Sequence, residues 1–188
     1  MGTVFDELMK NLERELVSAI RMHIDYCNSK WGQNEIFCYV IYADSGFVAF
    51  GMAVGFFSES ENSYDKVSAR AADWQSIHER YDFFSGVDNI ANILVKAIQD
   101  GDYSDDDMAL SDQDCENMIF ETFLKVISDA LNTLLAECDF KKRAFCEEIL
   151  LGLQIVDPVE HQIDFILKVS SIFNSPYWHR RLKNEFLG

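Results

Sequence analysis

The chain has 188 residues, of which 48% are apolar and 13% aromatic, with only 2 prolines and 9 glycines. This composition excludes a disordered, collagen-like or disulfide-stapled protein and indicates one globular domain over residues 1–188. The 16 Lys and Arg against 32 Asp and Glu give a net charge of −16, which argues against nucleic acid or an anionic membrane as partner.

The first predicted element is a helix that Thr3 can cap, with Asp6 and Glu7 in the first turn, where the helix dipole favours negative charge. We expect it to end near Asn28, before a polar stretch that contains Gly32. Apolar residues recur along this segment at helical spacing: Phe5, Leu8, Leu12, Leu16, Ile20 and Ile24.

Two strand-like runs follow, at residues 36–43 and 47–54, separated by Asp44, Ser45 and Gly46. A short connection that ends in Gly predicts a hairpin with a bulged turn. Both runs are nearly continuous in apolar residues, so we expect helices to cover the hairpin on both faces.

The pattern is least clear between residues 58 and 84. It contains a short helical candidate at residues 65–73 and an aromatic cluster of Trp74, Tyr81, Phe83 and Phe84. A third helix is predicted to begin after Ser85 and to stop at Gly101. Its apolar positions are Val87, Ile90, Ala91, Leu94 and Ile98.

The fourth helix has the strongest apolar stripe in the chain. Ser111 can cap it, and Asp112, Asp114 and Glu116 lie in its first turn. The stripe should form the helix face that packs against the sheet, and consists of Ile119, Phe120, Phe123, Ile127, Leu131, Leu134 and Cys138.

A buried strand is predicted at residues 149–156, and Pro158 suits the first turn of a following helix. Pro176 interrupts that helix, and residues 177–187 form a last short one. We therefore expect an α+β fold with a small mixed or antiparallel sheet, made of the hairpin plus the late strand and flanked by several helices.

The sequence lacks the motifs of the common catalytic and nucleotide sites. It has no G-x-S-x-G elbow, and Gly46, Gly51 and Gly55 are too loosely spaced for a phosphate-binding loop. The pair of His78 and Glu79 lacks the second histidine of a zinc-protease helix. We expect no enzymatic activity, no catalytic residues and no cofactor.

Metal binding is not predicted either. His23 and Cys27 could share a face of the first helix, but no second ligand pair accompanies them, and His161 and His179 stand alone. We expect a core histidine beside a buried thiol. The five cysteines form an odd set without C-x-x-C spacing, typical of reduced thiols: Cys27, Cys38, Cys115, Cys138 and Cys146.

Targeting signals are missing from the N-terminal segment, which has neither the basic nor the apolar region of a secretory signal. The longest apolar run, residues 47–57, has about half of the ~20 residues that a membrane-spanning helix needs. We expect a cytoplasmic protein without membrane contact.

An acidic run at residues 100–116 contains no Lys or Arg. No start position in it meets the demands of a calcium-binding loop. It could be a solvated loop, could pair internally with the basic residues 179–183, or could be a contact surface for a cationic partner. In the last case the partner-binding residues are Asp102, Asp105, Asp106, Asp107, Asp112, Asp114 and Glu116.

Several short motifs resemble a bacterial family, the domain-of-unknown-function family numbered 4303. They are YVIYAD at residues 39–44, FVAF at 47–50, WQSIH at 74–78, IVD at 155–157 and FNSP at 173–176. The resemblance covers nearly the whole chain, which departs from the family in its acidic run. The family is similar to the immunity proteins of bacterial polymorphic toxin systems. The resemblance therefore implies a protein that neutralises a partner by binding it, and it transfers no catalytic residue to this chain.

The leading hypothesis is thus a non-enzymatic immunity protein whose acidic surface neutralises a basic toxin domain. One alternative is an enzyme that uses carboxylates in an aromatic pocket near Trp74 and Tyr81. Another is a regulatory partner of a basic host protein.

Overall fold

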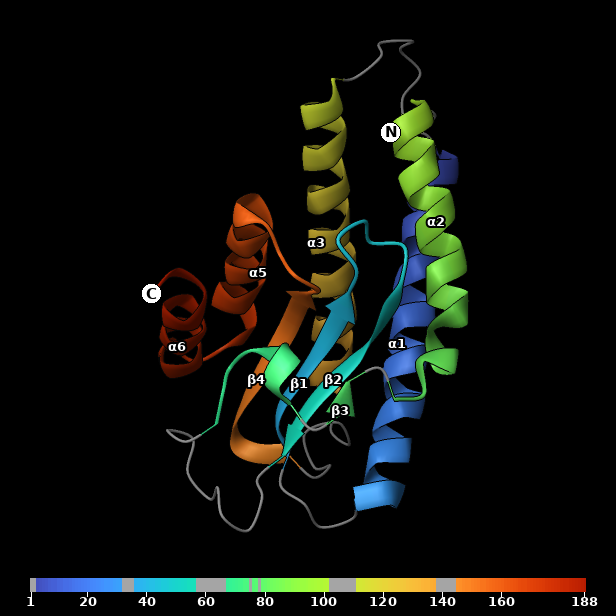
Figure 1. Cartoon of the computed structure of the whole chain (residues 1–188). Coiled ribbons are helices and arrows are strands. Elements are labelled where there is room, and N and C mark those ends of the chain that lie inside the picture. Colours follow the sequence, from blue (N-terminus) through green and yellow to red (C-terminus); the bar gives the residue numbers. More distant parts are fainter. Residues whose placement is uncertain are drawn as a thin grey trace.

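A computed structural model describes residues 3–31, 36–56, 67–74, 76–77, 79–101, 111–137 and 145–188. The helices are α1 (Thr3–Trp31), α2 (Ser85–Asp100), α3 (Asp112–Ala136), α5 (Glu160–Phe173) and α6 (Pro176–Leu187) (Figure 1). The strands are β1 (Ile36–Ala43), β2 (Phe50–Phe56), β3 (Ser76–Ile77) and β4 (Phe145–Ile155). Two 3-10 turns, η2 (Ala71–Asp73) and η3 (Tyr81–Phe84), lie between β2 and α2 in the chain.

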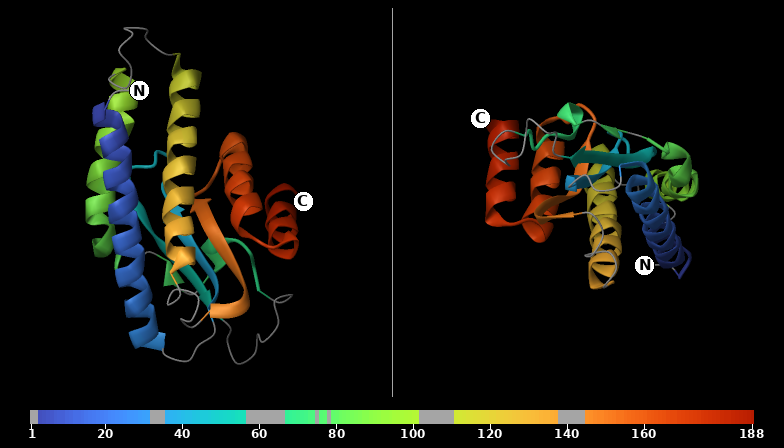
Figure 2. Two further views of the ribbon diagram at one scale, coloured as in Figure 1. Left: turned by 180° about the vertical axis from the view of Figure 1, so that it is seen from behind. Right: turned by 90° about the horizontal axis from the view of Figure 1, so that it is seen from below.

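The four strands form one mixed sheet in the order β3-β2-β1-β4. β1 pairs with β2 in antiparallel register, Val40 opposite Ala53, and with β4 in parallel register, Val40 opposite Gly152. The predicted α+β fold, a small mixed sheet of a hairpin plus a late strand, is confirmed. Every residue of β1 is buried, which confirms that the hairpin is covered on both faces. The expectation that helices supply the cover on both is wrong, because α1 and α3 lie along one face and the segment that contains η2 lies on the other (Figure 2).

Helices surround the sheet unevenly. α1 and α3 lie along one face, and α5 and α6 lie beyond the β4 edge (Figure 2). The ring of Phe123 on α3 stacks on Phe50 of β2 with centroids 5.6 Å apart. On the opposite face, η2 is attached to β4, because the side-chain oxygen of Gln154 accepts from the Ala71 amide at 2.6 Å.

The predicted helix boundaries are confirmed where a capping residue marks them. The Ser111 hydroxyl accepts from the Asp114 amide at 3.2 Å and caps α3. Gly101 follows α2 with a φ of 81°, in the left-handed region that glycine adopts without strain. Pro176 occupies the first turn of α6, whose cap is Ser175.

α1 continues beyond the predicted end at Asn28 as far as Trp31. Tertiary contacts explain the extra turn. The Trp31 ring lies 5.1 Å from that of Phe56 on β2, and Lys30 forms an ion pair with Glu79. These contacts hold the last turn against the sheet although its own sequence is polar.

The predicted start of the second strand at Phe47 is wrong, because β2 begins at Phe50. Phe47 has a φ of 56° and is buried. The Asp44 carboxylate organises the turn: its Oδ1 atom accepts from the amides of Val48 at 2.8 Å and Ala49 at 3.0 Å. The left-handed residue is therefore Phe47 rather than Gly46, and its ring enters the core.

Residues 67–84 also differ from the prediction. The described part of the 65–73 segment contains only the η2 turn instead of a helix, because its backbone bonds to Gln154. The aromatic cluster is not formed: Trp74 is buried beside Phe37, whereas Tyr81 is 61% exposed. β4 begins at Phe145, earlier than the predicted 149.

Candidate partner-binding groove

The candidate site is a groove of about 510 Å³ between the β1–β2 turn, the C-terminal half of α2 and the N-terminal half of α3. Its apolar lining comes from Phe47, Val95, Ile119 and Phe120. Its polar lining comes from Ser45, Gln99, Asp112, Cys115 and Glu116. No Lys or Arg lines it among the described residues, so we name it the acidic groove.

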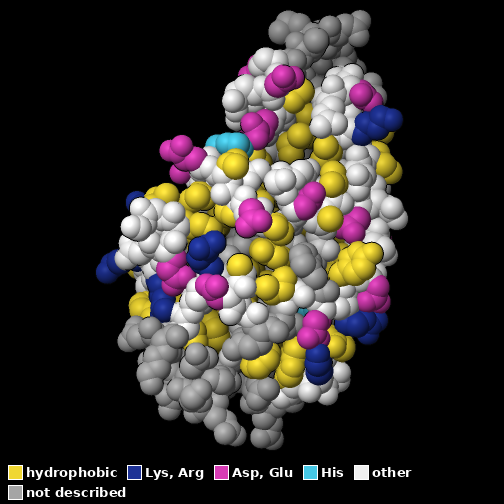
Figure 3. Space-filling model, viewed as in Figure 1, with side chains coloured by type: hydrophobic (Ala, Val, Ile, Leu, Met, Phe, Trp, Pro, Cys, Tyr) yellow, Lys and Arg dark blue, Asp and Glu magenta, His cyan; other side chains and the backbone are white. Residues whose placement is uncertain are grey.

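The space-filling view shows the same arrangement. Apolar side chains are visible in the hollow between α2 and α3, and acidic side chains flank them (Figure 3). Asp112 and Glu116 are four residues apart on α3, so they project from one face of the helix. One wall of the groove therefore carries two carboxylates above an apolar floor.

The floor is held by aromatic packing. The ring of Phe120 meets Phe47 edge-on with centroids 5.6 Å apart and stacks on Phe165 of α5 at 5.1 Å. Phe47 in turn stacks on Phe123 at 4.9 Å. Because Phe47, Phe123 and Phe165 are buried, the floor is continuous with the hydrophobic core, and Phe120 is its partly exposed surface.

Residues of α5 contact two residues that line the acidic groove, Glu116 and Phe120. The Nε2 atom of His161 lies 2.7 Å from the Glu116 Oε1 atom, and its ring lies 5.5 Å from that of Phe120. The side-chain amide of Gln162 donates to the Ser45 carbonyl oxygen at 3.2 Å. These contacts orient Glu116 and fix the β1–β2 turn against the helices.

The structure separates the seven predicted partner-binding residues. Asp112 and Glu116 line the acidic groove. Asp114 does not line it, because its carboxylate accepts from the Ser111 hydroxyl at 2.6 Å and belongs to the helix cap. The other four lie outside the described residues: Asp102, Asp105, Asp106 and Asp107.

Sequence reasoning missed the contribution of His161, which was expected to stand alone. Sequence reasoning also missed Val95 and Phe47 as groove residues. These residues come from segments far apart in the chain, so no local spacing could bring them together.

Among the basic residues 179–183, Arg181 on α6 pairs with Glu185 on the same helix at 3.3 Å and also donates to the Val67 carbonyl oxygen.

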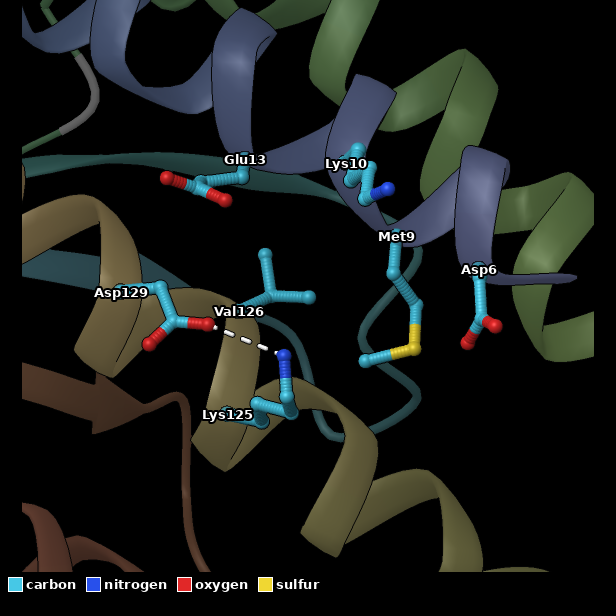
Figure 4. Close-up of a pocket in the computed structure, with 7 residues that line it drawn as sticks. All are labelled: Asp6, Met9, Lys10, Glu13, Lys125, Val126 and Asp129. Atoms are coloured by element: carbon cyan, nitrogen blue, oxygen red, sulfur yellow. Dashed lines mark hydrogen bonds and ion pairs between the residues drawn. The ribbon is translucent and has the colours of Figure 1, made fainter. Parts of the chain in front are cut away.

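A second groove, of about 220 Å³, lies between α1 and α3 (Figure 4). Side chains of both signs line it. On its α3 side, Lys125 lies 3.1 Å from Asp129 in an ion pair. Its other lining residues are Asp6, Met9, Lys10, Glu13 and Val126. Because two lysines lie beside its three carboxylates, it offers less electrostatic preference for a cationic partner than the acidic groove does.

A buried polar cluster lies beneath the C-terminal half of α1. The His23 Nδ1 atom is 3.4 Å from the Cys27 sulfur, and both side chains are buried, as predicted. Burial lowers the pKa of His23 to about 4 and raises the pKa of the Cys27 thiol to about 12. Within the described ranges, no three His, Cys, Asp or Glu side chains converge in a way that could hold a metal ion.

No protein-family model, curated protein or solved structure matches this chain. Among the helices that the structure describes, none combines the length and the apolar character needed to cross a membrane.

Proposed function

We propose that the chain is a non-enzymatic binding protein that holds a basic segment of a partner protein in the acidic groove. The observation that carries this proposal is the joint presence of Asp112 and Glu116 beside an apolar floor, with no Lys or Arg among the described residues that line the groove. Carboxylates attract the charged end of a basic side chain, and the floor accepts its aliphatic part.

The overall charge supports the same kind of partner. At a net charge of −16, long-range attraction raises the rate at which a cationic protein meets the chain. Asp102, Asp105, Asp106 and Asp107 directly precede α3 in the sequence and add to that attraction wherever they lie. We propose that the partner is a bacterial toxin domain and that the chain is its immunity protein.

A protection assay tests the proposal. If a toxin gene lies beside the gene for this chain, cells that express that toxin should survive when they also make the parent protein. The double variant Asp112→Asn, Glu116→Gln should lose protection at equal protein level, because it removes both groove carboxylates.

Asp129→Asn is the matched control, since it removes one carboxylate from α3 outside the acidic groove. It should protect like the parent. A double variant that protects fully would remove the acidic groove from the proposal, and a parent that fails to protect would remove the immunity function.

A further inference from the structure

We infer that the acidic groove selects arginine over lysine side chains in its partner. This inference rests on the proposed function, because it names the chemistry of the residue that the groove holds. It follows from the spacing of the two carboxylates, the fixed position of one of them and the apolar character of the floor.

The spacing of the two carboxylates suits a donor group that reaches both. Asp112 and Glu116 lie one helical turn apart on α3, which places their Cβ atoms about 5–6 Å from each other. A guanidinium group carries five N–H donors in a planar fork and can reach two acceptors at once. A lysine ammonium is a compact point charge that gains less from a second acceptor.

Glu116 is oriented by a contact with α5. Its Oε1 atom lies 2.7 Å from His161 Nε2, and its side chain is 38% exposed. Among the described residues, no basic side chain forms an ion pair with Asp112. One acceptor is therefore fixed in direction and the other is available, which favours a ligand with donors in a fixed geometry.

The apolar floor removes water from a cation that enters the groove. The groove that carries both carboxylates is also lined by Ile119 and the partly exposed Phe120, so a cation held there shares the groove with apolar side chains. Guanidinium is more weakly hydrated than ammonium and packs flat on apolar and aromatic surfaces. Lysine would lose more hydration at the same place.

The experiment compares two probes of equal charge, fluorescent hexa-arginine and hexa-lysine peptides, at one physiological salt concentration. The parent protein should bind the arginine peptide about tenfold more tightly, which corresponds to ~1.4 kcal/mol. In Asp112→Asn and in Glu116→Gln this ratio should fall toward one, whereas Asp129→Asn should keep it. Urea unfolding curves establish that the variants are folded.

The thiol of Cys115, a free and partly exposed groove residue, shows whether the peptide binds in the acidic groove. The arginine peptide should slow its alkylation, measured by peptide mass spectrometry, in the parent and in Asp129→Asn.

The outcomes separate the inference from the proposed function. Equal affinity for the two peptides, lost in Glu116→Gln, would overturn arginine selectivity and leave a groove for basic segments. If neither peptide binds, or if both bind without protecting Cys115, both the selectivity and the groove function are overturned.

Discussion

The Nδ1 atom of His23 on α1 lies 3.0 Å from the hydroxyl oxygen of Tyr39 on β1, and both residues are buried. A titratable ring thus joins α1 to β1, an interior strand of the sheet. Burial disfavours the charged imidazolium and lowers the pKa of His23 to about 4, and the backbone and carboxylate of Glu79 oppose this shift only in part.

Stability should therefore fall in mild acid. The unfolded chain binds a proton at His23 near pH 6.5, whereas the folded chain does so only near pH 4. The unfolded state binds more protons between these values, so the free energy of unfolding decreases as the pH falls through this window, by ~3 kcal/mol for this group.

Urea unfolding of the parent and of His23→Leu, at pH 7 and pH 4.5, measures the effect. The loss on acidification should be smaller in His23→Leu and unchanged in Met22→Leu, a control at an exposed apolar side chain of the same helix. Equal losses in the parent and in His23→Leu would contradict the assignment to His23.

Phe123→Ala should cost about 3–5 kcal/mol of unfolding free energy, because it leaves a cavity in the core. Phe123 is 1% exposed and stacks on both Phe47 and Phe50. Ile172→Ala, at a side chain that is 52% exposed, is the control and should shift the urea midpoint little. An unchanged midpoint for Phe123→Ala would mean that the apolar stripe of α3 is not the core face.

Asp44→Ala should destabilise the protein by about 1–3 kcal/mol, because two backbone amides of the β1–β2 turn lose their acceptor. Asp44→Asn keeps a side-chain oxygen and should cost clearly less. Thermal unfolding of the two variants gives the comparison. Equal melting temperatures for Asp44→Ala and Asp44→Asn would show that the turn does not depend on the Oδ1 acceptor.

Gln154→Leu should open the segment that contains η2. The Gln154 side chain accepts from the Ala71 amide at 2.6 Å and donates to the Ala69 carbonyl oxygen at 2.7 Å. Each buried group left without a partner costs about 1–3 kcal/mol. Hydrogen exchange at Ala71 should accelerate well beyond the global change, and Gln113→Leu on the exposed face of α3 should leave it slow.

Much of the fold could be predicted because local signals agree with it. Ser111 and Gly101 mark helix ends through their own side-chain and backbone chemistry, and the residues of β1 are apolar throughout. The start of β2 could not be predicted, because Phe47 adopts a left-handed conformation to place its ring among Phe50, Phe123 and Phe165. That conformation depends on tertiary packing.

The candidate site was predictable only as an acidic run. In the sequence, Asp112, Asp114 and Glu116 are equally acidic candidates. Only the structure distinguishes them, because the Asp114 carboxylate accepts from the Ser111 hydroxyl whereas Asp112 and Glu116 line the groove. Charge alone also gave no means of finding His161, which lies 2.7 Å from Glu116 Oε1 although 45 residues separate the two in the chain. The groove exists because the β1–β2 turn, α2 and α3 meet there.

The parallel pairing of β1 with β4 has a consequence for how the chain is made. Val40 pairs with Gly152, and a ribosome that adds about 5–20 residues per second needs roughly 5–20 s to deliver the second after the first. Throughout that interval the apolar edge of β1 lacks its natural neighbour and can template pairing with other chains. We expect the nascent segment around β1 to be where misassembly begins, so that slower synthesis lowers the yield of native protein.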